Sequence, residues 1–157
     1  MNRSVQTLVN RLGLEPHAEG GYYREIYRSA TMVKPGDDRP IRSAATTIYF
    51  LLAAGQHSAW HRVRSDEIWH FYQGDPLQLF VGAPAMDRVE TITLDQLRPV
   101  YVVPADWWQA ARPMGEFTLT GCTVAPGFEF TDFAMLRDEP SARDAIERID
   151  GSMMELI

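Results

Sequence analysis

Cysteine and long apolar runs are scarce in this sequence. A single cysteine among 157 residues excludes an internal disulfide framework and fits a reducing compartment. No apolar run approaches the ~20 residues that a membrane-spanning helix needs. The first residues, MNRSVQTLVNRLGL, lack the apolar core and cleavage site of a secretory signal. We therefore expect a cytoplasmic location.

Basic residues are also fewer than acidic residues. The chain carries 15 Lys and Arg against 21 Asp and Glu, which gives a formal net charge of −6. An acidic chain without a basic cluster has no electrostatic reason to bind nucleic acid or an anionic membrane. Neither is therefore an expected partner. Hydrophobic residues make up 45% of the chain and charged residues 23%, which is ordinary for a globular domain.

Common catalytic signatures are missing as well. The sequence contains no G-x-G-x-x-G, P-loop, H-E-x-x-H, paired C-x-x-C or G-x-S-x-G. Its single cysteine, Cys122, stands in the apolar stretch TLTGCTV. A reactive thiol needs an accessible, electropositive setting, so we interpret Cys122 as an unreactive core thiol.

What the sequence does contain is a series of short strands with a helix at each end. Residues 4–12 space apolar side chains as an amphipathic helix does, and Ser141 with Asp144 form a capping box for a second helix that Gly151 ends. Strands are predicted over 22–27, 43–53, 66–74, 76–82, 90–94, 99–104, 107–112, 116–128 and 128–135. This pattern indicates an all-β sandwich or barrel, with residues 1–157 as a single domain.

Several of these strands are apolar on both faces. One face would fill the interior, so the other must meet a second sheet or a second subunit. The sequence therefore predicts a homodimer.

The densest polar cluster lies in AWHRVRSDEIWHFYQG, residues 59–74. Together with the preceding glycine, its spacing resembles the first cupin motif, which places two histidines and a glutamate around a metal at one end of a β-barrel. The residues at the motif positions are Gly55, His61, Val63, Glu67 and Gly74.

A second stretch, VVPADWWQAAR, resembles the second cupin motif, P-x-G-x-x-H. Pro104 matches it, Asp106 stands where glycine is usual, and Gln109 stands where a histidine is usual. The resemblance is therefore complete for the fold and partial for the metal site.

Flanking segments narrow the resemblance. EPHAEGGYYREIYRS, TTIYFLL and GCTVAPGFEFTDFAML, with the two motifs, are similar to one cupin group long carried as a domain of unknown function, over about residues 7–137. That group has bacterial and fungal members. The resemblance implies an RmlC-like jelly roll, or double-stranded β-helix, that is dimeric and holds a small-molecule pocket inside the barrel. It implies no particular reaction.

The metal ligands implied by the resemblance are incomplete. Valine at position 63 cannot coordinate, and an amide oxygen is a poor ligand where transition metals favour several imidazoles or carboxylates. No cofactor is certain, and a weakly bound divalent ion on His61, Glu67 and Gln109 is the most that we expect. His70 cannot replace the missing ligand in a regular strand, because it points away from the face that carries Glu67.

The same residues suit metal-free acid–base chemistry, because an imidazole and a carboxylate inside an apolar barrel perturb each other's pKa. In this hypothesis His61 is the base, Glu67 orients it or acts as the acid, and Gln109 hydrogen-bonds a substrate oxygen. The other expected ligand-binding residues are Tyr49, Trp69, Phe71, Trp107 and Glu19. The alternative is a His–Glu hydrogen bond that only satisfies two buried polar groups.

A second polar cluster is HAEGG, residues 17–21, whose glycines permit a tight backbone. Two interpretations are open: a loop that closes over the pocket mouth, or a turn that delivers the next strand to the sheet. We assign His17 to the turn, and Glu19 fits either interpretation. His57 is interpreted as a surface residue.

Asp66 is adjacent to Glu67 but belongs to the opposite face of a regular strand. We therefore expect it to pair with Arg62 or Arg64.

Three functions stay open: an isomerase or epimerase acting on a sugar-like or carbonyl metabolite, a non-catalytic small-metabolite binding protein, and a weakly metal-dependent cupin enzyme. Val63 and Gln109 in place of histidines weigh against the third.

Overall fold

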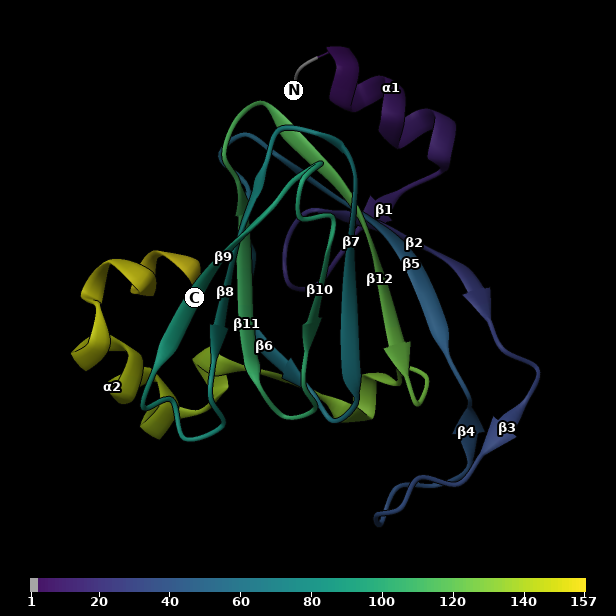
Figure 1. Ribbon diagram of the computed structural model, residues 1–157. Helices are drawn as coiled ribbons and strands as arrows, with labels where there is room; N and C mark the ends of the chain where they lie inside the picture. Colours follow the sequence, from purple (N-terminus) through teal and green to yellow (C-terminus); the bar gives the residue numbers. More distant parts are fainter. Residues whose placement is uncertain (1–2) are drawn as a thin grey trace.

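The computed structural model describes residues 3–157, so residues 1 and 2 of the predicted domain lie outside it (Figure 1). The strands are β1 Glu15–Pro16, β2 Tyr22–Arg28, β3 Met32–Val33, β4 Arg42–Ser43, β5 Thr46–Ala53, β6 Ser58–Val63, β7 Asp66–Gly74, β8 Leu77–Gly82, β9 Val89–Leu94, β10 Val100–Val103, β11 Trp108–Pro113, β12 Phe117–Ala125 and β13 Phe133–Met135. The helices are α1 Arg3–Leu12 and α2 Pro140–Ile149, with short 3-10 turns η1 Phe130–Asp132, η2 Leu136–Asp138 and η3 Gly151–Leu156.

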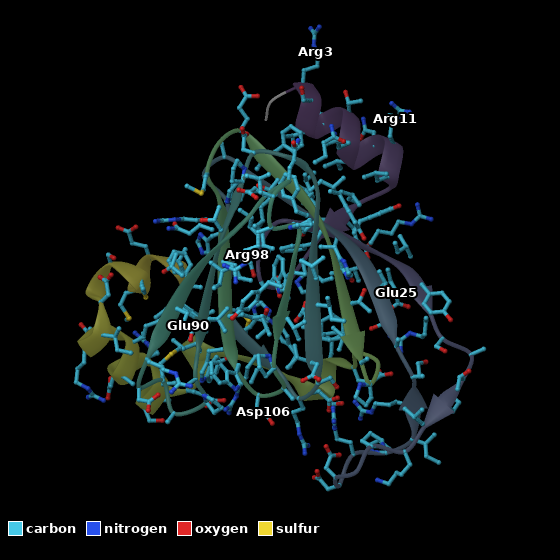
Figure 2. The ribbon with its side chains drawn as sticks, viewed as in Figure 1. Arg3, Arg11, Glu25, Glu90, Arg98 and Asp106 are labelled. Atoms are coloured by element: carbon cyan, nitrogen blue, oxygen red, sulfur yellow. The ribbon has the colours of Figure 1, made fainter. Side chains whose placement is uncertain are left out.

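Two antiparallel sheets face each other and enclose the main core (Figure 1). The larger sheet has the order β1-β2-β5-β12-β7-β10, and the smaller has the order β13-β6-β11-β8-β9. Side chains fill the space between them (Figure 2), and Phe50, Trp69 and Leu79 are among the buried residues there. The all-β jelly-roll sandwich with a helix at each end, predicted from the sequence, is confirmed.

Helix α1 covers one end of the larger sheet. Val5 of α1 is buried in one cluster with Leu51 and Leu119, which lie on the outer face of β5 and β12. Arg3 and Arg11 point away from the sheets, as an amphipathic helix requires (Figure 2).

Helix α2 and the turns beside it cover the smaller sheet. Ile146 of α2 shares a buried cluster with Trp60 and Trp108, which come from β6 and β11. The chain's own helices therefore explain part of the apolar outer faces from which the homodimer was predicted. No helix within residues 3–157 is long and apolar enough to cross a membrane.

Some predicted boundaries were wrong. The strand predicted over 43–53 is divided, because Arg42–Ser43 pairs with β3 in a separate hairpin and β5 begins at Thr46. Most of the strand predicted over 128–135 is a loop and a 3-10 turn. The second helix begins at Pro140, and Ser141 lies inside it, so the predicted capping box does not form.

Candidate functional site

A pocket with a cavity volume of about 160 Å³ lies between the two sheets. One water molecule needs ~10–15 Å³ by the same measure, so the pocket is large enough for a small molecule. The lining comes from strands β1, β2, β5, β6, β7, β12 and β13, from the segment 17–21, and from the loop that follows β12. The pocket therefore brings together both polar clusters found in the sequence.

His61 is buried in this pocket with a defined tautomer. Its Nδ1 lies 2.8 Å from the carbonyl oxygen of Ala59. A carbonyl only accepts hydrogen bonds, so Nδ1 carries the hydrogen and the neutral ring presents an unprotonated Nε2. Burial lowers the pKa of His61, and the charge of Glu67 opposes this effect.

Glu19 is the direct partner of this imidazole. Its Oε2 lies 3.2 Å from Nε2 of His61, and its Oε1 accepts a hydrogen bond of 2.8 Å from the Ser58 hydroxyl. Burial raises the pKa of Glu19 to about 7. Near neutral pH the pair therefore holds one proton between a carboxyl group and an imidazole.

Two glycines allow Glu19 to reach the pocket. Gly20 and Gly21 adopt φ angles of +108° and +68°, and a Cβ on Gly20 would lie 2.2 Å from the carbonyl oxygen of His57. Any larger residue would push the loop away from β6. The backbone N–H of Ala59 donates to the carbonyl of Glu19 at 2.7 Å. The HAEGG segment is thus held against β6 and contributes to the pocket.

His17 also lines the pocket. Its predicted role in a turn did not include a place in the pocket. Its Nδ1 accepts the backbone N–H of Glu19 at 3.3 Å, and its ring meets Tyr23 edge-on with centroids 4.5 Å apart. Burial lowers the pKa of His17. A neutral second imidazole therefore stands beside the Glu19–His61 pair.

Glu67 lines the pocket from β7 and is fixed by a buried chain of hydrogen bonds. Gln109 donates from Nε2 to Oε2 of Glu67 at 2.5 Å, and Trp69 donates from Nε1 to Oε1 of Gln109 at 2.7 Å. Burial raises the pKa of Glu67. Both ends of the Gln109 amide are engaged inside the protein, and Gln109 is not part of the pocket lining, so it positions Glu67. Its predicted contact with a substrate oxygen stays a prediction.

The remaining expected ligand-binding residues lie elsewhere. Tyr49 packs in the cluster under α1 and meets Tyr72 on the outer face with ring centroids 6.1 Å apart. Trp69 is buried in the main core, and Phe71 and Trp107 pack against it outside the pocket lining. Of the expected site residues, the structure brings together His61, Glu67 and Glu19.

An aromatic wall completes the pocket and was missed by the sequence reasoning. It consists of Phe128, Phe130 and Phe133. Asp132 lies within the same segment, and its buried carboxylate accepts hydrogen bonds from the Nη1 atoms of Arg42 and Arg39. The charge pairs hold the wall as a loop and a turn. The segment FEFTDF could have suggested such a wall, because its aromatic residues gather around one acid.

The other singled-out residues lie in the following places. Cys122 is buried at the pocket lining and burial raises its thiol pKa, in agreement with an unreactive thiol. His70 stacks on Tyr72 on the outer face, as the strand alternation predicted. His57 is half-buried outside the pocket lining.

The pairing predicted for Asp66 was wrong. Its carboxylate accepts the backbone N–H of Ala105 at 2.9 Å. Arg62 donates to Glu139 instead, and Arg64 donates to Asp38.

Comparison with known proteins agrees with this architecture. Residues 6–136 match the family described as Cupin superfamily (DUF985). The chain belongs to this cupin family. A hypothetical protein from Leishmania major is similar at 30% identity and a TM-score of 0.79, over 91% of this chain and 96% of that one. A protein from Shewanella oneidensis is similar at 35% identity and a TM-score of 0.75, over 86% of this chain and 85% of that one.

More distant cupins share the fold alone. An oxalate decarboxylase from Lactobacillus farciminis is 17% identical with a TM-score of 0.60, over 82% of this chain and 35% of that one. No curated protein matches the chain.

The donors at the cupin metal positions do not fit a metal ion in this chain. Val63 has no donor atom, and the amide of Gln109 is engaged by Glu67 and Trp69. Across residues 3–157, no three His, Cys, Asp or Glu side chains are grouped so that they could hold a metal.

Proposed function

We propose that this cupin is an enzyme of the isomerase or epimerase type, which moves a proton on a small metabolite bound between its sheets. The observation that carries the proposal is the 3.2 Å contact between Glu19 and His61 in the pocket. Because the pKa of Glu19 is about 7 and Nε2 of His61 is unprotonated, the pair offers one acid and one base at neutral pH.

The chemistry follows from the two atoms. Nε2 of His61 takes a proton from a carbon next to a carbonyl group, and the Glu19 carboxyl donates its proton to the carbonyl oxygen. The products are an enol, an imidazolium and a carboxylate. The imidazolium then returns its proton to a carbon of the enol, and the Glu19 carboxylate takes a proton back from an enol oxygen, so both groups are restored. Protonation of the same carbon from the other side gives an epimer, and protonation of the former carbonyl carbon of an enediol gives an isomer. The Glu67 carboxylate, when ionised, stabilises the imidazolium by its charge.

This proposal revises the roles expected from the sequence. His61 remains the base, but its direct partner is Glu19, and Glu67 acts on His61 through its charge. A non-catalytic binding protein is the alternative, and it requires no proton exchange with solvent.

The test is exchange of carbon-bound hydrogen in D₂O. The protein is incubated with a panel of small aldehydes, ketones and reducing sugars, and deuterium incorporation is followed by NMR. We expect incorporation into at least one compound, with losses on the order of 100-fold in Glu19→Gln and in His61→Asn. His70→Gln is the matched control, since His70 lies on the outer face.

Two results would contradict the proposal. Absence of exchange with every compound, despite measurable binding, would favour the non-catalytic alternative. Exchange that survives in both Glu19→Gln and His61→Asn would place the proton chemistry on other groups.

A further inference from the structure

We propose that the pocket selects a small organic cation, an alkylammonium compound, over neutral and anionic compounds of the same shape. This inference deepens the proposed function by naming its ligand class, and it rests on that function only in using the same pocket. It is supported by three observations: the negative charge of the pocket lining, the ion pairs that already occupy the basic side chain of the lining, and the aromatic wall.

The lining is strongly acidic. The carboxylic residues that line the pocket are Glu15, Glu19, Glu25, Glu67 and Glu129. Arg28 is the one Lys or Arg among the described residues of the lining. Even with Glu19 and Glu67 protonated, the remaining carboxylates outnumber the cation, so an anionic ligand meets net repulsion.

Arg28 is not available to bind an anion. Its Nε and Nη2 donate to the two carboxylate oxygens of Glu25 at 3.0 and 2.9 Å. Its Nη1 donates to Glu129 at 3.0 Å, and Nη2 donates again to the carbonyl of Phe128 at 3.1 Å. Glu25 stands on β2 at the side of the barrel (Figure 2). A phosphate or carboxylate ligand would have to displace a bidentate ion pair, whereas a cation leaves it intact.

The aromatic wall offers ring faces in several directions. Phe128 lies 5.0 Å from Phe130 and 6.1 Å from Phe133 between centroids, with interplanar angles of 80° and 73°. Tyr23 lines the pocket as well. Rings set at such angles present both edges and faces to the pocket, and an aromatic face is the group that attracts an ammonium ion.

Phe130 is the residue of this wall that a ligand would cover. Its side chain is 59% exposed, although buried ion pairs anchor the segment that carries it. The anchors are Asp132 and the arginines that bind it, Arg39 and Arg42. The exposed ring is therefore held in place at the pocket, as a binding surface requires.

The experiment compares three probes of nearly equal shape by isothermal titration calorimetry. They are choline, its neutral isostere 3,3-dimethylbutan-1-ol, and the anion 3,3-dimethylbutanoate. We expect choline to bind at least about tenfold more tightly than the alcohol, because cation–π attraction in a desolvated pocket is of that size. The carboxylate should show no binding at millimolar concentration.

Variants separate the cation effect from simple packing. Phe130→Leu should weaken choline binding several-fold while changing the affinity for the alcohol by less than about twofold. Tyr72→Leu removes an exposed aromatic ring from the outer face, where it stacks on His70, and should leave both affinities unchanged.

Three outcomes overturn the inference: alcohol or carboxylate binding as tightly as choline, no binding of any probe at millimolar concentration, or equal losses for choline and alcohol in Phe130→Leu. Choline preference without deuterium exchange would overturn only the catalytic proposal. Exchange on a neutral or anionic substrate without choline preference would overturn only the ligand class.

Discussion

The substitution Glu19→Gln tests whether the pocket holds a protonated carboxyl group. Glutamine keeps the shape of the side chain, and it can still accept from the Ser58 hydroxyl and donate to Nε2 of His61 in place of the contacts that Glu19 makes. It cannot ionise. The variant therefore removes the titration of this buried group and leaves its packing in place.

The magnitude follows from the pKa of Glu19, which burial raises from 4.5 to about 7. Below the unfolded value both states are protonated, and the carboxyl group adds no pH dependence. As pH rises through this window the unfolded chain loses its proton and the folded protein keeps it, so the wild type loses stability. At ~1.4 kcal/mol per pKa unit the full loss is about 3 kcal/mol.

Urea unfolding at a series of pH values, followed by fluorescence of the buried tryptophans, measures this difference. The free energy of unfolding of Glu19→Gln, relative to the wild type, should rise by about 3 kcal/mol between about pH 4.5 and pH 8. The control Glu90→Gln, at an exposed position of β9, should run parallel to the wild type. A pH-independent difference for Glu19→Gln would refute the reasoning and remove the acid from the mechanism.

Gln109→Ala leaves the indole of Trp69 and the carboxyl of Glu67 without their buried partner. We therefore expect urea unfolding to show a free energy of unfolding that is lower by about 3 kcal/mol. A decrease below about 1 kcal/mol would contradict the importance of this network. Asp106 has a φ of +66°, which alanine tolerates poorly and glycine tolerates well. Asp106→Ala should therefore lower the free energy of unfolding by about 1 kcal/mol, and Asp106→Gly should lower it by less. Equal thermal denaturation of the two variants would disprove this. The homodimer stays a prediction. Because the apolar side chain of Val102 on β10 is 47% exposed, we expect light scattering to show a dimer for the wild type and a monomer for Val102→Asp. A monomeric wild type would contradict the prediction.

The fold was predictable because spacing and alternation are local properties of the sequence. The first cupin motif placed His61 and Glu67 at one pocket. The strand parity correctly turned Glu67 inward and His70 outward. The second motif usually has glycine where this chain has Asp106. Asp106 has a positive φ, and it can take the glycine position because aspartate tolerates that backbone better than most residues.

The rest of the site depends on contacts between distant segments. Glu19 reaches His61 because Gly20 permits close approach to a strand almost forty residues away, and no local pattern reports such an approach. Tyr49 lies in a strand that is apolar on both faces, so its direction could not be deduced from alternation. Likewise, Gln109 occupies a ligand position by spacing, but its partners come from another strand.

The position of Glu19 has a consequence for how such a site can be altered. His61 and Glu67 belong to strands of the sandwich, whereas Glu19 is carried by the short segment 17–21 that is attached to β6 through its backbone. Backbone hydrogen bonds do not depend on side-chain identity. The segment could therefore accept another side chain at position 19 without rebuilding the sandwich, so this barrel is a scaffold in which the acid is replaceable independently of the base.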